Sequence, residues 1–156
     1  MDGISIRRIV CAVDFSDSSD HAQRYAVGLA EVFDAELRIL HVVEPPFLPT
    51  YSLAGVPNLA LPIEEVEDAA RKHLQQAVEA CRAVHADTEG ILRTGSPFVE
   101  IINCARETEA DLIVVGTHGR TGLSHMLIGS VAEKVVRKAP CPVLSVKHPD
   151  HSFSPP

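Results

Sequence analysis

The sequence predicts a single doubly wound α/β domain, in which a five-stranded parallel sheet of strand order 3-2-1-4-5 carries helices on both faces. Its 156 residues fit one domain with a substantial core. Short apolar runs alternate along the chain with longer stretches whose apolar residues repeat at helical spacing. The short runs are apolar throughout rather than at every second position, which is typical of parallel strands buried on both faces.

The first three elements are expected within residues 9–43. The apolar run at 9–13 is too short for a helix and ends at a cluster of turn and cap residues, so it predicts a buried strand. Between 22 and 33, apolar residues recur at i, i+3, i+4 and i+7 and predict an amphipathic helix. The run at 37–43 predicts the second strand.

A proline-rich segment at 44–62 interrupts the regular elements. Its five prolines exclude a helix or a central strand, so a long exposed loop is expected. Loops of this length in compact domains are either functional or loosely ordered. Composition leaves open whether this segment closes over a ligand.

The middle of the chain predicts two further helices and one strand. Apolar residues repeat with helical period over 64–84, and a weaker strand is expected at 89–93. The tripeptide Gly95-Ser96-Pro97 supplies a turn, an N-cap and a proline for the first helical position. It predicts a helix that ends near Thr108.

Two more strands complete the expected sheet. The run at 112–115 is the most apolar of all and leads directly into Gly116, while 142–146 predicts a fifth strand. Residues 1–147 are therefore expected to form the domain, and 148–156 a disordered tail.

Composition argues against several classes of protein. The formal net charge is −7 and no run of Lys and Arg could follow a phosphate backbone, so nucleic acid is not an expected partner. No apolar run approaches the roughly 20 residues that cross a bilayer, and no leader peptide is evident. We therefore expect a cytoplasmic protein with no membrane partner. Four widely spaced cysteines, without a CxxC pair, are expected to be free thiols, mostly buried.

Two loops are expected to meet at one edge of the sheet. In the order 3-2-1-4-5 the sheet grows outward in both directions from strands one and four, which leaves a crevice at their carboxyl ends. Asp14 follows the first strand and Gly116 follows the fourth, so both should face this crevice. From position alone, Asp14 is equally suited to contact a ligand or to cap the first helix, a role for which Ser16 and Ser18 compete.

A glycine-rich segment runs from Gly116 to Ser130. Its glycines allow the backbone to approach a ligand closely. Ser130 followed by Glu133 matches a capping box, so a helix should begin there with its N–H groups and positive dipole end open to an anion. Phosphate binding explains these residues, and so do plain turns with a helix cap. Arg120 is the one clear cation of the segment for a triphosphate.

Other kinds of site are poorly matched. Neither the Walker sequence nor the GxGxxG fingerprint is present, and the histidines form no HxH or HExxH pattern, so no protein-bound metal is expected. A serine hydrolase would need Ser124, His118 and Asp14, but the GxSxG elbow is missing. No catalytic residue is therefore assigned.

Four residues of the glycine-rich segment follow a distinctive spacing. Gly116 is followed after two residues by Gly119, and after nine more by Gly129 and Ser130. This spacing resembles that of the nucleotide-binding members of the universal stress protein family, and the resemblance extends over nearly the whole chain. The other matching segments are 13–16, 41–43, 95–97 and 139–143.

The resemblance implies an ATP site and assigns residues to its adenine end. It implies that Asp14 contacts the ribose or adenine side of the nucleotide. It also implies that the backbone at Val13 and Val42 meets the adenine and that Val115 packs nearby.

At the other end of the ligand, the resemblance implies that Gly116 and Gly119 border the ribose and phosphates. Gly129, Ser130 and Val131 would hold the phosphates, which agrees with the helix-start argument made from the residues themselves. The remaining members of the candidate site lie in the same segment: His118 and Arg120.

Three functional hypotheses remain open. The first is an ATP-binding stress-response or signalling module, a homodimer in which, as the resemblance implies, the C-terminal strands of two subunits pair. The second is an enzyme that slowly hydrolyses ATP or transfers its nucleotide, slowly because no base for an attacking water is evident. The third is an interaction protein that binds no nucleotide. Mg2+ would arrive with ATP, with Asp14 and Asp17 as its nearest carboxylates.

Overall fold

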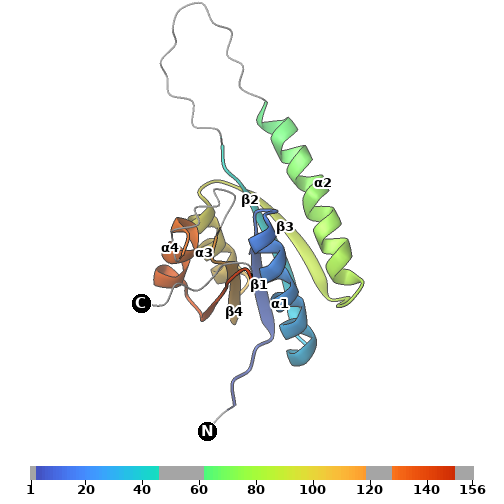
Figure 1. Cartoon of the computed structure of the whole chain (residues 1–156), viewed down its shortest axis with the longest axis vertical. Coiled ribbons are helices and arrows are strands. Elements are labelled where there is room, and N and C mark those ends of the chain that lie inside the picture. The colour runs from blue at the N-terminus through green and yellow to red at the C-terminus, as the bar shows by residue number, and fades with distance from the viewer. Residues whose placement is uncertain (1–2, 46–61, 119–127, 150–156) are drawn as a thin grey trace, which may run out of the picture.

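A parallel sheet forms the centre of the domain. The computed structural model describes residues 3–45, 62–118 and 128–149. In these residues five parallel strands lie in the order β3-β2-β1-β4-β5, which confirms the predicted order (Figure 1). The elements are β1 (Arg8–Val13), α1 (Asp17–Phe33), β2 (Glu36–Val43), α2 (Ile63–Arg82), β3 (Thr88–Thr94), α3 (Pro97–Glu107), β4 (Leu112–Gly116), α4 (Ser130–Lys138) and β5 (Val143–Val146).

Helices cover both faces of the sheet, as the continuous apolar runs of the strands predict. One face of the sheet packs against α1 and α2, and the other against α3 and α4 (Figure 1). Along β1, Ile9 and Cys11 join the first cluster and Val10 joins the second. All three side chains are almost completely buried, because consecutive residues of a strand point to opposite faces.

The element boundaries differ from the predicted ones by a few residues. The helix α1 begins at Asp17, five residues before the first periodic apolar residue, because Ser16 acts as its N-cap and accepts a hydrogen bond from the Ser19 N–H. The helix α3 begins at Pro97 after the N-cap Ser96, as predicted.

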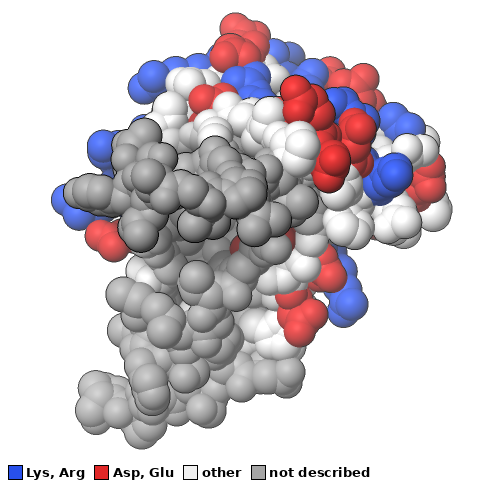
Figure 2. All heavy atoms as spheres, turned by 90° about the horizontal axis from the view of Figure 1, so that it is seen from above, with Lys and Arg blue, Asp and Glu red and all other residues white. Residues whose placement is uncertain are grey.

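Two segments discussed above lie largely outside the described residues. The proline-rich segment is described only at its ends, and the C-terminal tail only to residue 149. Within the described ranges no helix combines the length and apolarity needed to cross a membrane. On the face seen in Figure 2, acidic and basic side chains are interspersed.

A close contact joins the end of β4 to the start of α1. A Cβ added to Gly116 would lie 2.8 Å from Ser18 Oγ and 3.0 Å from the Ser18 carbonyl oxygen. Only glycine therefore fits at this position without a shift of the helix backbone. By contrast, a Cβ added to Gly28, within α1, would have no heavy atom within 4 Å apart from the backbone of its own helix.

These two glycines allow a matched stability test. We expect Gly116→Ala to lower the free energy of unfolding by about 1–3 kcal/mol, because α1 must move to admit the methyl group. Gly28→Ala should raise it by about 0.5–1 kcal/mol, because alanine loses less backbone entropy in a helix. Urea denaturation monitored by circular dichroism measures both. Equal stability of the two variants would contradict the packing role of Gly116.

Candidate functional site

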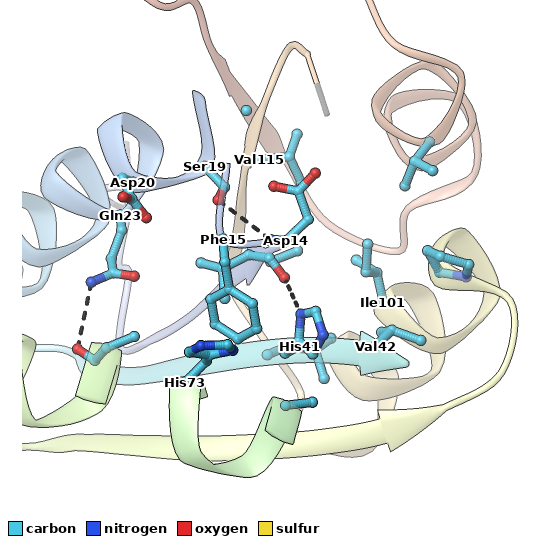
Figure 3. Close-up of a pocket in the computed structure, with 18 of the residues that line it drawn as sticks. Asp14, Phe15, Ser19, Asp20, Gln23, His41, Val42, His73, Ile101 and Val115 are labelled. Carbon is cyan, nitrogen blue, oxygen red and sulfur yellow. Dashed lines mark hydrogen bonds between the residues drawn. The ribbon is translucent and has the colours of Figure 1, made fainter. Parts of the chain in front are cut away.

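A cavity of about 1450 Å³ opens at the carboxyl edge of the sheet. Its walls come from the ends of β1, β2 and β4 and from the first turns of α1, α3 and α4, and it continues between α1 and α2 (Figure 3). All the predicted site residues that the structure describes line it: Val13, Asp14, Val42, Val115, Gly116, His118, Gly129, Ser130 and Val131. Gly119 and Arg120 lie outside the described residues.

The part of the cavity next to α3 and α4 has an apolar wall. Val42 and Val115 belong to the α3–α4 side of the sheet, where Ile101 also packs. Val13 packs on the opposite side with α1 and α2. Its side chain therefore does not face the same compartment as the other predicted apolar residues, because β1 alternates its side chains between the two faces.

Asp14 stands at the centre of a hydrogen-bond network at the start of α1. Its Oδ1 accepts from the Ser16 N–H at 3.1 Å and from Ser16 Oγ at 2.5 Å, and its own N–H donates to Ser19 Oγ at 3.3 Å. Since Ser16 is the N-cap of α1, Asp14 does not cap the helix itself but holds the capping residue in place. Its carboxylate points away from His41 and towards the side of Val115 (Figure 3).

A backbone acceptor lies beside Asp14 at the end of β2. The Glu36 N–H donates to the Arg7 carbonyl of the segment that leads into β1. Alternate residues of a strand direct their N–H and C=O groups towards the same neighbouring strand, so those of Val42 also point towards β1. However, β1 ends at Val13, and Phe15 leaves the extended conformation with φ 61°. In the described ranges no backbone N–H outside the strands donates to the Val42 carbonyl. This oxygen therefore lies just beyond the last hydrogen bond between β1 and β2.

The start of α4 provides backbone donors on the other side of the cavity. Its N-cap is Gly129, and no side chain from the described ranges is seen to cap it. The predicted capping box is therefore wrong: Ser130 is the first helical residue, and the Glu133 carboxylate pairs with Arg137 one turn further on. The Gly129 N–H donates to the Thr117 carbonyl, which fixes the helix start beside the end of β4.

Ser18 supports the site from behind Gly116, a role that the sequence did not indicate, since it suggested only a helix cap. It is buried, it contacts Gly116, and its Oγ accepts from the His118 N–H at 3.4 Å. Gly116 was expected to let a ligand approach, whereas its lack of a side chain is explained by α1. The sequence carries no signal for this contact, because the two residues meet only through the β1–β4 pairing.

Phe15 and His41 also line the cavity, and neither was assigned a role from sequence. Their ring centroids lie 4.2 Å apart, and the Phe15 ring lies 5.5 Å from that of His73 on α2 (Figure 3).

Burial keeps three cysteine thiols of the described residues from being activated nucleophiles. Burial raises the pKa of the Cys81 thiol at the cavity wall, and a hydrogen bond from Gln23 offsets part of this rise. Burial likewise raises the pKa of Cys11 and of Cys104. In the described part of the chain no three potential metal ligands gather. Ser124, which the hydrolase alternative needs, lies outside that part.

The fold and site define a class of protein: a doubly wound α/β domain with a ligand cavity at its topological switch point. The model of the universal stress protein family matches residues 5–147. The chain belongs to the universal stress protein family.

Individual relatives agree with this assignment over almost the whole chain. The chain is 40% identical over 146 residues to universal stress protein MJ0531 of Methanocaldococcus jannaschii, a match that covers 92% of this chain and 83% of the relative. It is 38% identical over 147 residues to universal stress protein YxiE of Bacillus subtilis, covering 90% and 98%. Among solved structures, UspA from Lactobacillus plantarum aligns with a TM-score of 0.77 at 28% identity, covering 92% and 99%.

Two similar structures were solved with adenine nucleotides. One is a universal stress protein in complex with cAMP, at TM-score 0.70 and 26% identity, covering 92% of this chain and 98% of the other. The second is the universal stress protein from Archaeoglobus fulgidus in complex with dAMP, at TM-score 0.65 and 27% identity, with the same coverage.

The burial of the thiols leads to a test of their inertness. We expect Cys141, which is only half-buried, to react first with a thiol reagent at about pH 8, while Cys11 and Cys104 react only on unfolding. Mass spectrometry of the labelled peptides over time measures the order. Protein labelled in guanidinium serves as the control, in which all four thiols should react. Rapid labelling of Cys11 in the native protein would contradict this order.

Proposed function

We propose that this chain is an ATP-binding universal stress protein that acts as a stress-response or signalling module. The observation that carries the proposal is the cavity at the switch point, which has a carboxylate and an open backbone acceptor at one end and a helix start with a glycine N-cap at the other. Such an arrangement suits a ligand with a polar base and an anionic tail.

The base and ribose end of the ligand would lie between Asp14 and the apolar wall. The Val42 carbonyl suits the exocyclic amine of adenine, because it is an acceptor at the end of the ladder. The Asp14 carboxylate suits ribose hydroxyls or ring donors. Val115 and Ile101 would pack against the base. The cAMP and dAMP complexes of similar proteins support an adenine nucleotide as the ligand class.

The phosphate end would lie at the start of α4. Helix N-termini bind phosphate through free N–H groups and the positive end of the helix dipole. The N-cap Gly129 carries no side chain over this start, and Ser130 and Val131 provide the first N–H groups. Gly119 and Arg120 remain predicted members of the site, and Mg2+ would accompany the triphosphate through its oxygens.

The cavity supports binding better than catalysis. Fast phosphoryl transfer needs a positioned base or water-orienting group and cations on the transferred phosphate. The described lining does not bring such a set together, so any hydrolysis of ATP would be slow. We therefore propose that the protein holds the nucleotide and that other proteins recognise the nucleotide-bound form. We also propose that it is cytoplasmic and has neither nucleic acid nor a membrane as a partner.

A homodimer through β5 forms part of the proposal. β5 is an edge strand of the sheet. The Ile113 N–H donates to the Pro142 carbonyl and the Thr117 N–H to the Val146 carbonyl. Pro142 and Val146 thus direct their carbonyls towards β4. Because successive residues of a strand direct their backbone groups to opposite sides, the N–H and C=O of Ser145 point outward, away from β4. An outward row of unpaired backbone groups suits pairing with a second copy.

Nucleotide titration tests the ligand. Isothermal titration with ATP, ADP, AMP and cyclic AMP should detect binding, with Gly129→Arg abolishing it because the new side chain fills the phosphate space at the start of α4. Val136→Arg is the matched control, since it adds the same charge on an exposed position of the same helix. Unchanged ATP affinity in folded Gly129→Arg, or no binding by the unaltered protein, would contradict the proposal.

Light scattering tests the dimer. Ser145→Pro removes an outward N–H without breaking the β4–β5 ladder, so a dimer that pairs through β5 should become a monomer. Ser145→Ala keeps the N–H and should remain dimeric. The two variants are compared by gel filtration with multi-angle light scattering. A monomeric parent protein, or a proline variant that stays dimeric, would exclude pairing through this edge.

A further inference from the structure

One imidazole contacts both sequence neighbours of Asp14. The Nδ1 of His41 lies 2.8 Å from the Val13 carbonyl oxygen, and since a carbonyl only accepts, this nitrogen carries the hydrogen. The Phe15 ring packs on the same imidazole, with centroids 4.2 Å apart and planes at 32°. Asp14 is therefore flanked on both sides by residues that His41 contacts.

The conformation of Phe15 separates its ring from the carboxylate of Asp14. Phe15 has φ 61°, in the left-handed region that non-glycine residues seldom adopt. The turn sends the Phe15 ring towards His41 and His73, while the Asp14 carboxylate points the opposite way (Figure 3). The contact with His41 stabilises a backbone shape that would otherwise be unfavourable.

His41 is a rigid anchor for this turn. It lies on β2, which pairs with β1 on one side and β3 on the other, and its side chain is buried. The start of α4, by contrast, is fixed through Thr117 at the end of β4. The two ends of the cavity are therefore held by different contacts, and only one of them depends on His41.

We infer that His41 is a positioning residue that holds Asp14 at the base and ribose end of the site, acting through Val13 and Phe15. This inference rests on the proposed nucleotide site and adds a determinant of how the base end is recognised. Loss of His41 should weaken recognition of the nucleoside part and leave the phosphate part unchanged.

Two variants separate the contributions of His41. His41→Phe keeps an aromatic ring beside Phe15 but removes the donor to the Val13 carbonyl. His41→Asn keeps a short side-chain donor but removes the ring. Ile39→Val, at a fully buried position on the same strand, is the control for a general loss of stability.

Binding is measured by displacement of a fluorescent ATP analogue with ATP and with inorganic tripolyphosphate. We expect His41→Phe to bind ATP at least about tenfold more weakly, which corresponds to about 1.4 kcal/mol, with tripolyphosphate affinity unchanged within about twofold. His41→Asn should recover part of the ATP affinity, and Ile39→Val should keep both affinities. Equal weakening of ATP and tripolyphosphate, or unchanged ATP affinity in folded His41→Phe, would overturn the inference.

Amide hydrogen exchange provides a readout that needs no ligand. The Asp14 and Ser16 amides donate to Ser19 Oγ and to Asp14 Oδ1, so they report the shape of this turn. In His41→Phe both should exchange faster, while the Glu133 amide in α4 keeps its protection. Unchanged exchange at Asp14 and Ser16 would refute the positioning role of His41, whether or not the protein binds ATP. Failure of the unaltered protein to bind ATP would refute only the proposed function.

Discussion

Parallel pairing of β1 with both β2 and β4 is the constraint on which the rest of the structure depends. Ile9 pairs with Leu37 on one side and with Leu112 on the other, so all three strands run in the same direction and end at the same edge. Asp14, the Val42 carbonyl and Gly116 come together there although about a hundred residues separate the first from the last. The helix that follows β1 begins at that edge as well, which places the Ser16–Ser19 turn beside the cavity.

Close packing at this edge gives several residues a structural role where a ligand role was expected. Gly116 needs to be small because Ser18 lies against it, whatever ligand binds. The family resemblance places the backbone at Val13 and at Val42 against adenine, and the Val13 carbonyl accepts a hydrogen bond from His41. Of these two positions, the Val42 carbonyl is the open acceptor, because β1 ends before reaching it. The same contacts that stabilise the fold thus decide which backbone groups stay available.

The elements could be predicted well because their signals are local. Short apolar runs predicted the strands, helical periodicity predicted α1 and α2, and cap signals predicted α3 and α4. The boundaries are a few residues off where a cap such as Ser16 begins the helix early. The capping box at Ser130 was wrong because the helix starts at the residue after Gly129, and Glu133 pairs with Arg137 instead. Whether Asp14 caps the helix or faces the cavity was undecidable from spacing, because several polar residues compete within one turn.

The sequence by itself determined the type and order of the elements and the strand order of the sheet, and it placed Asp14 and Gly116 at the carboxyl edge. These follow from periodicity and from the rule that a doubly wound sheet leaves its crevice at the switch point, both of which are visible along the chain. Only the tertiary structure decided that Ser18 explains Gly116, that His41 contacts both neighbours of Asp14, and that Val42 presents the open carbonyl. Such contacts join residues from separate strands and helices, so they depend on register and packing, which no local pattern of side chains encodes.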